Sequence, residues 1–452
     1  MEQAVAAADT AWMLAAFAAV SIMVAGLALF YGGMVSVKNT LNMAMMVFGA
    51  LAVVGVLWIV VGYSASFGNS LGGLGLLGDP LEYFGSAKLL DAPATPGLPP
   101  AIFSAFQLLF AALTVALIAG AVADRMKFGS WMIFAGIWAL LVYFPVAHWV
   151  FAFDSKDGSV HGGWIANKLK AIDFAGGTAV HINAGVAGLA LALVLGKRHV
   201  FPNSPRPHSL PLTMLGAGIL FFGWFGFNGG SALSSGNSAS VVVLNTLAAS
   251  CAGICAWLVV EKLRQGHATT LGGASGLIAA LVGITPACGA VSPLGALVVG
   301  AACSVLCCFT VSLKYRFGFD DSLDVVGIHL AGGILGTILI GFLADPAAPN
   351  GVAGLFYGGG FDQLWRQTLA TLAVLTYTGI VTFAIAKVMR FCGGIRVDED
   401  AETNGLDLAV HSETAYVLDH FTVVGPKTEP ADAVSAAESI QRNNQVSSGT
   451  SA

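Results

Sequence analysis

Long apolar runs, separated by short polar segments, dominate this chain. Neither the stretch 207–260 nor the stretch 265–313 contains a single Asp, Glu, Lys or Arg. Because about 20 apolar residues in a helix cross the hydrocarbon layer of a bilayer, each stretch can hold more than one span. The pattern predicts an all-α integral membrane protein that crosses the lipid bilayer many times.

We expect eleven transmembrane helices, with predicted ranges 10–35, 40–63, 101–123, 130–151, 173–195, 211–230, 240–260, 271–285, 292–313, 322–343 and 366–389. If the N-terminus lies outside, the inner segments hold 13 Lys and Arg residues and the outer segments hold five. Lys and Arg accumulate in cytoplasmic loops, so this asymmetry favours an N-out, C-in orientation. An even number of spans would put both ends on one side and remove the asymmetry.

The character of the sequence changes near residue 393. We expect a transmembrane domain at 1–392 and a cytoplasmic tail at 393–452, whose distal part is rich in Ala, Ser and Asn and is predicted to be disordered. The N-terminus has no positive segment before its first apolar run, so we interpret that run as a span and not as a signal peptide.

Composition narrows the function. The chain is 56% apolar and only 10% charged, far below the quarter that is typical of soluble domains. The net charge of −5 gives no reason to expect a nucleic-acid partner. The cysteines lack paired metal-binding spacing, so we expect no metal and no cofactor. No nucleophile or metal cluster accompanies the histidines described below, and an enzyme is not expected.

The order of motifs repeats along the chain. LALFYGG at 27–33 and WFGFNGG at 224–230 each place aromatic residues before a glycine pair. Span five carries His181 and span ten carries His329. Five spans per half, an odd number, would give the two halves opposite orientations, as in inverted-repeat transporters with a site at their interface. We therefore expect five plus five spans and one extra helix.

The two histidines are the first candidates for function. An imidazole is costly in hydrocarbon, so each should face the protein interior or a pathway. For a single intramembrane histidine, a structural hydrogen bond to a neighbouring helix is as good an explanation as a functional role. Two, one from each half, can instead relay a proton or hold a small polar molecule. Asp173 and Asp324, near the helix starts, are expected to anchor the helices, and Asp173 also to attract cations.

Aromatic residues gather near the predicted outer face. Interfacial belts are their ordinary explanation, but a cluster in one vestibule would attract a desolvating cation through its ring faces. A serine beside them could accept a hydrogen bond from a cation with N–H groups. The candidates are Phe110, Phe151, Trp224, Phe227 and Ser231. Such a site suits a small hydrogen-bonding solute and lacks the oxygen cage that Na⁺ or Ca²⁺ requires.

Several long motifs, in order, resemble the ammonium transporter family (Amt/Mep), which is related to the Rhesus proteins. They are GLALFYGGMVSVKNTLNM (26–43), DFAGGTAVHINAGVAGL (173–189), GWFGFNGGS (223–231), GLIAALVGITPACG (276–289) and DVVGIH (324–329). The similarity runs on to the tail segment 405–416.

This resemblance implies a homotrimer in the cell (plasma or inner) membrane, with a narrow hydrophobic pore in each subunit. Ammonium would be recruited outside and lose its proton, and ammonia would pass a twin-histidine pore while the proton is transferred separately. By motif position, the pore residues are His181, His329 and Trp224, and the recruitment residues are Phe110, Phe151, Phe227, Ser231 and Asp173. The stacked gate would be Phe110 with Phe227, and a PII-type regulator would bind the cytoplasmic face.

The sequence departs from the family pattern at some positions. Phe151 replaces the usual Trp of the recruitment site, and Trp149 would compensate if its helix face allowed it. Ala25 replaces a common Pro, and Ala409 replaces a Thr that some relatives phosphorylate. Two alternatives to an ammonium transporter therefore stay open: an ammonium sensor with little transport, and an electroneutral ammonia or CO₂ channel of the Rhesus type.

Overall fold

All regular secondary structure in the described residues is helical. The computed structural model describes residues 2–91, 97–203 and 206–416. The all-α class predicted from the sequence is confirmed. The predicted disorder of the distal tail concerns residues 417–452, which lie outside the described residues. Residues up to Ala415 form one compact unit, and only this unit is described below.

The elements follow the apolar runs closely. Those before residue 200 are α1 (Glu2–Met34), α2 (Thr40–Leu57), α3 (Tyr63–Phe67), α4 (Pro100–Val122), α5 (Phe128–Trp138), α6 (Phe144–Phe151) and α7 (Asn183–Leu195). The next are α8 (Leu210–Gly230), α9 (Asn237–Gln265), α10 (Thr270–Ile284), α11 (Pro293–Thr310), α12 (Leu313–Phe317), α13 (Ala331–Leu343) and α14 (Asp362–Cys392). Two short helices end the described chain, α15 (Glu399–Asn404) and α16 (Leu406–His411).

Short π-helical segments extend several spans. Trp58–Gly62 joins α2 to α3, and Ala139–Tyr143 joins α5 to α6. Two others begin the histidine-bearing spans: η7 (Gly177–Ile182) runs into α7, and η8 (Val326–Leu330) runs into α13. π-Helical turns inside α-helices occur frequently at functional sites, which directs attention to these two.

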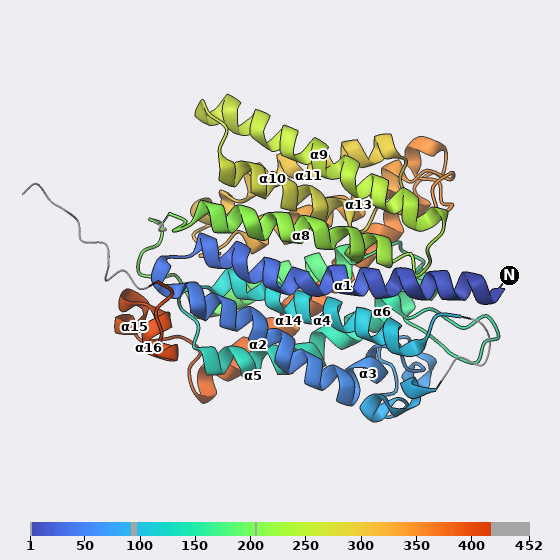
Figure 1. Ribbon diagram of the computed structural model, residues 1–452, viewed down its shortest axis with the longest axis horizontal. Helices are drawn as coiled ribbons and strands as arrows, with labels where there is room; N and C mark the ends of the chain where they lie inside the picture. The colour runs from blue at the N-terminus through green and yellow to red at the C-terminus, as the bar shows by residue number, and fades with distance from the viewer. Residues whose placement is uncertain (1, 92–96, 204–205, 417–452) are drawn as a thin grey trace, which may run out of the picture. The chain divides into compact units, whose positions relative to one another are not determined.

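Ten helical segments in the described part of the chain are long and apolar enough to cross a bilayer. Each coincides with a predicted span. The eighth predicted span corresponds to α10, which has 15 residues and falls short of that length. The start of α1 and the pair α15–α16 lie at opposite ends of the helices in Figure 1, as an odd number of crossings requires.

The first helices of the two halves pack side by side. Figure 1 shows α1 and α8 running next to each other along their length. A Cβ atom at Gly216 would lie 2.3 Å from the backbone nitrogen of Phe30, and one at Gly223 would lie 2.1 Å from Cγ of Met23. Small residues at such contacts let two backbones approach and gain dispersion energy, which drives helix association in membranes.

Buried ion pairs tie together the loops at the end that carries α15 and α16. Arg198 forms ion pairs at 2.9 Å with both Asp124 and Asp320. Burial alone would raise the pKa of Asp320, but the hydrogen bonds and charge of Arg198 outweigh it and hold that pKa below its ordinary value. Burial lowers the pKa of Arg125, which donates to the carbonyl of Asp320, to about 10. These contacts fix the loops that follow α4, α7 and α12.

Candidate functional site

The two intramembrane histidines lie against each other. The Nδ1 atoms of His181 and His329 are 3.3 Å apart, and their rings are nearly parallel, with centroids 5.3 Å apart and an interplanar angle of 24°. Both side chains are buried. A hydrogen bond between two Nδ1 atoms needs one donor and one acceptor, so a neutral pair holds one proton between the rings.

The outward nitrogens of such a pair differ in character. The ring that donates through Nδ1 has a bare Nε2 acceptor, and the ring that accepts has an Nε2–H donor. Nε2 of His181 is buried and has no hydrogen-bond partner among the described residues. A buried polar atom without a partner costs about 1–3 kcal/mol, which a passing hydrogen-bonding solute would relieve.

Asp173 fixes the start of the first histidine helix. Its carboxylate accepts hydrogen bonds from the backbone N–H groups of Gly176, Gly177, Thr178 and Ala179, at 2.6–3.2 Å. The hydroxyl of Thr178 donates to it as well. Because the side chain occupies these N–H groups, the helix begins at Gly177 and not at the predicted residue 173. Asp173 thus has the anchoring role expected from the sequence.

Asp321 performs the corresponding task for the second histidine helix. Its carboxylate accepts from the backbone N–H groups of Val325 and Val326. Asp324, for which the sequence suggested this anchoring role, instead forms an ion pair with Lys314 at 2.7 Å. The prediction was therefore wrong about which acid caps the helix. Burial raises the pKa of Asp321 above its ordinary value.

Glycines bring the histidine helices together in a reciprocal way. A Cβ atom at Gly185, four residues after His181, would lie 2.5 Å from the backbone nitrogen of Leu330. A Cβ atom at Gly333, four residues after His329, would lie 3.1 Å from Cβ of His181. Each helix therefore approaches the other beside the partner histidine, as expected for two related halves.

The histidines line a narrow cavity of about 30 Å³. A water molecule needs roughly 10–15 Å³ of such volume, so the cavity suits one or two molecules of that size. Apart from the imidazoles, its polar groups are few: the indole N–H of Trp224 donates to Thr285, and the hydroxyl of Tyr31 to the carbonyl of Leu117. The other lining residues are Met23, Leu27, Phe30, Leu113, Leu117, Val180, Leu220, Phe227 and Ile278.

A stacked phenyl pair separates this cavity from a wider one. The rings of Phe110 and Phe227 are 4.0 Å apart at their centroids and inclined by 15°. Phe110 lines the wider cavity and Phe227 lines the narrow one. The stack therefore lies between them, with Phe227 on the histidine side, where its ring centroid is 6.5 Å from that of His181.

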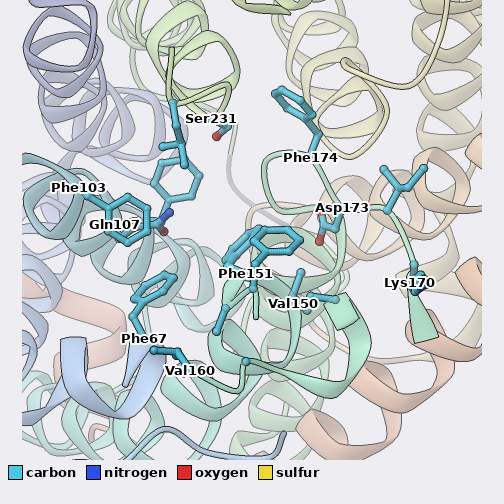
Figure 2. A pocket seen from close by; sticks show the side chains of 18 of the residues that line it. Phe67, Phe103, Gln107, Val150, Phe151, Val160, Lys170, Asp173, Phe174 and Ser231 are labelled. Atoms are coloured by element: carbon cyan, nitrogen blue, oxygen red, sulfur yellow. The ribbon is translucent and has the colours of Figure 1, made fainter. Parts of the chain in front are cut away.

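The wider cavity, here called the vestibule, has a volume of about 550 Å³. Figure 2 shows Gln107 and Ser231 on one side of it, Asp173 and Phe174 on the other, and the ring of Phe151 between them. The Ser231 hydroxyl donates to the carbonyl of Phe227, so its oxygen keeps lone pairs for a further donor.

Trp149 does not compensate for the phenylalanine at position 151. Its indole N–H donates to the carbonyl of Leu76, and its ring packs against Trp164 and Tyr377. Phe151 lines the vestibule and Trp149 does not. Beside Phe110 and Phe151, the aromatic surface of the vestibule includes residues that the sequence did not single out, namely Tyr63, Phe67, Phe103, Phe153 and Phe174.

The size and polarity of the narrow cavity favour small neutral molecules over ions. Across the described residues no cluster of His, Cys, Asp and Glu could hold a metal ion. A hydrated ion cannot enter a 30 Å³ apolar cavity without losing water that nothing there replaces. A small neutral molecule that donates and accepts hydrogen bonds loses little, because the two imidazoles offer it both partners. The fold and site define a polytopic helical membrane protein with a buried, imidazole-lined cavity that suits a small neutral solute.

The comparisons agree on one family. The profile of the Ammonium Transporter Family matches residues 11–416. The chain is 54% identical over 431 residues to the ammonium transporter of Mycobacterium tuberculosis H37Rv, covering 90% of each protein. It is 44% identical to that of Bacillus subtilis 168, covering 90% of this chain and 98% of the relative.

Solved structures give the same result. The crystal structure of Saccharomyces cerevisiae Mep2 matches with a TM-score of 0.79 at 35% identity, covering 87% of this chain and 88% of that one. A structure described as a sensor Amt protein matches with a TM-score of 0.82 at 26% identity, covering 91% and 100%. The chain belongs to the ammonium transporter family.

Proposed function

We propose that the chain moves ammonium across the membrane by separating it into ammonia and a proton. Ammonium enters the vestibule, where aromatic faces and the Ser231 oxygen hold it. It loses its proton there, ammonia passes between Phe110 and Phe227, and the histidine pair then holds it by hydrogen bonds. The proton follows a separate route, and the protein acts without a cofactor and not as an enzyme.

The observation that carries this proposal is the position of the histidine pair. Two contacting imidazoles lie in a 30 Å³ apolar cavity behind a stacked phenyl pair. Charge is costly in such a place and hydrogen bonding is favourable. The same geometry would exclude Na⁺ and K⁺.

Current recordings from proteoliposomes test the proposal. Ammonium pulses should produce a current in the wild-type protein, and His181→Ala or His329→Ala should abolish it or decouple proton from ammonia. His208→Ala is the matched control, because His208 lies just before α8 and lines neither cavity. Wild-type ammonium flux in both pore variants would refute the pore assignment.

A second function is an ammonium sensor that transports little. The similarity to the sensor Amt protein and the phenylalanine at position 151 favour it. Tight ammonium binding without current would support the sensor, and flux without current would support an electroneutral channel of the Rhesus type.

We also propose the assembly and setting implied by the family. The protein forms a homotrimer in the plasma or inner membrane, with its N-terminus outside and its tail in the cytoplasm. A PII-type regulator binds the cytoplasmic face. The division into a transmembrane domain at 1–392 and a tail at 393–452 belongs to the same proposal.

A further inference from the structure

Lys170 is the one basic side chain among the described residues that line the vestibule. It lies at the rim, on the same side as Asp173 in Figure 2. No hydrogen bond or ion pair of its amine to another described residue is found, and its side chain is exposed. A fixed positive charge is unexpected in a cavity that captures a cation, so its effect there needs an explanation.

The backbone does not account for a lysine at this position. Lys170 follows η6 (Ile165–Leu169) with φ 57° and ψ 37°, and its N–H donates to the carbonyl of Ile165. This left-handed conformation is one that glycine adopts without strain and that other residues adopt rarely. A non-glycine residue kept in a strained backbone conformation is a reason to look for a function.

The neighbouring basic side chains are directed elsewhere. The Lys168 amine donates to the carbonyls of Gly73 and Leu74. Arg366 forms an ion pair with Asp362 and donates to the carbonyl of Leu169. Of these three basic residues, only Lys170 lines the vestibule.

The acidic side chain of the vestibule does not neutralise Lys170 through a direct contact. Five hydrogen bonds from η7 and the residue before it already occupy the Asp173 carboxylate, which anchors the histidine helix. A bound ammonium ion in the vestibule is thus exposed to two opposite charges, and that of Lys170 is the repulsive one.

Resting on the proposed entry of ammonium through the vestibule, we propose that Lys170 is an affinity-determining residue. Its charge raises the free energy of ammonium held in the vestibule, and so raises the ammonium concentration needed for half-maximal uptake. It does not oppose neutral ammonia. When bound ammonium gives its proton to a vestibule water, ammonia and a hydronium ion are left, and the proton then takes the separate route proposed above. The repulsion on the substrate ends at that step.

This role predicts a joint change in two kinetic constants. A residue that destabilises the bound ground state raises KM and also raises the maximal rate of the step that relieves the strain. Removing the charge should therefore lower both constants, and their ratio should change less than either. Lys170→Gln should lower the apparent KM about threefold, the size expected for one charge acting through water in the vestibule.

The experiment is a charge series measured as ammonium-evoked current in proteoliposomes. Lys170→Arg keeps the charge and should keep the wild-type KM. Lys170→Gln should lower KM, and Lys170→Glu should lower it further, to about one tenth of the wild-type value. Lys170→Gly removes the charge together with the backbone strain, so it should match Lys170→Gln. Lys168→Gln is the matched control, because it removes an outer charge that does not line the vestibule.

Ionic strength gives an independent readout. The difference in KM between wild type and Lys170→Gln should shrink when N-methylglucamine chloride is raised from 20 to 500 mM, because the Debye length falls to about 4 Å. A KM that is equal in the Arg, Gln and Glu variants would overturn the proposal. So would a difference that does not depend on salt.

Failure of this inference is distinguishable from failure of the proposed entry route. If Phe151→Trp and Ser231→Ala change KM but the Lys170 series does not, the vestibule captures ammonium and Lys170 plays no part. If none of these variants changes KM, the vestibule is not the entrance, and both the proposed entry route and the proposed role of Lys170 are wrong.

Discussion

In the proposed function, two uncharged imidazoles select the solute. Because His181 and His329 meet through their Nδ1 atoms at 3.3 Å, each presents its Nε2 away from the other ring. One of these nitrogens accepts and the other donates, and the roles exchange if the shared proton moves. The described residues that line this cavity offer no cage of oxygen ligands to an alkali cation, whereas ammonia can bond to either nitrogen.

Phe151→Trp is expected to tighten the apparent affinity for ammonium. An indole is a stronger cation–π partner than a phenyl ring, and the gain of roughly 0.5–1 kcal/mol corresponds to about two- to fivefold in KM. The 550 Å³ vestibule has room for the larger ring. KM from ammonium-evoked currents is the measurement. Phe222→Trp, at an exposed position of α8, is the control, and equal KM values in all three proteins would place the recruitment site elsewhere.

Gly185→Ala is expected to reduce transport strongly. Its Cβ would lie 2.5 Å from the backbone nitrogen of Leu330, so the two histidine helices would have to separate. Misplacing a binding group by about 1 Å can cost about 100-fold in rate. Gly379→Ala in α14 is the control, because its Cβ meets Val186 at an ordinary 3.4 Å. Ammonium flux and thermal stability in detergent should both fall for the first variant, and unchanged flux would contradict the reciprocal packing.

At the scale of elements, the histidine helices depend on what precedes them. η7 and η8 begin at acidic side chains, Asp173 and Asp321, that accept hydrogen bonds from the free N–H groups. Those groups would otherwise be unsatisfied at the edge of the membrane, where water is scarce. Each acid thus fixes the depth of a histidine in the bilayer. In both helices the histidine follows the acid by eight residues.

Arg198→Gln is expected to destabilise the protein by about 3–5 kcal/mol, because it leaves two buried carboxylates without their cation. The cluster joins the loops after α4, α7 and α12, so the loss should appear as a lower melting temperature in detergent. Arg206→Gln, in the same connection between α7 and α8 but outside this cluster, is the control.

The pH dependence of this variant gives a sharper test. In the wild type, the pKa of Asp320 is held below its ordinary value, so its contribution is present above pH 4 and lost as pH falls through the lowered pKa. In Arg198→Gln, the carboxylates of Asp124 and Asp320 lack this cation. Their protonation as pH falls from 7 to 5 should remove buried charge and so raise the stability of the variant. If the difference in melting temperature between the variant and the wild type stays constant from pH 7 to 5, the ion pairs contribute little.

At the scale of the whole chain, the bilayer explains why so much apolar surface is tolerated. Large hydrophobic side chains are exposed on many helices, among them Leu14, Val56, Leu141, Phe222, Leu244 and Leu372. In water such a surface would cause aggregation, but in lipid it is solvated. The polar groups that are buried instead pair inside the bundle, as Trp138 does with Thr382 and Asn183 with Thr378.

Reporter fusions test the orientation of this assembly. A reporter that is active only in the cytoplasm should be active after residue 416 and silent before residue 2, because an odd number of crossings puts the ends on opposite sides. Fusions in the loop after α4 and in the loop after α6 serve as inner and outer controls. Both ends on one side would contradict the predicted eleven spans, and native mass spectrometry of the same preparation should show a trimer.

The sequence alone determined the class of protein and the positions of its spans, because apolar runs of membrane length leave few alternatives to helices. It also singled out His181 and His329, because rare polar residues in such runs need partners, and the aromatic candidates, because ring faces attract a cation. Asp321 and the matching HINAG and HLAGG segments, in which a glycine follows each histidine by four residues, were visible but not recognised.

The tertiary structure decided which faces meet. In a helix that is apolar on every side, the hydrophobic pattern does not show which side is buried, so only packing could direct Phe151 into the vestibule and Trp149 away from it. The stack of Phe110 on Phe227 joins helices far apart in sequence, and Lys170 lines the vestibule at a left-handed backbone position. These contacts depend on interhelical distances of a few ångströms, which local sequence does not specify.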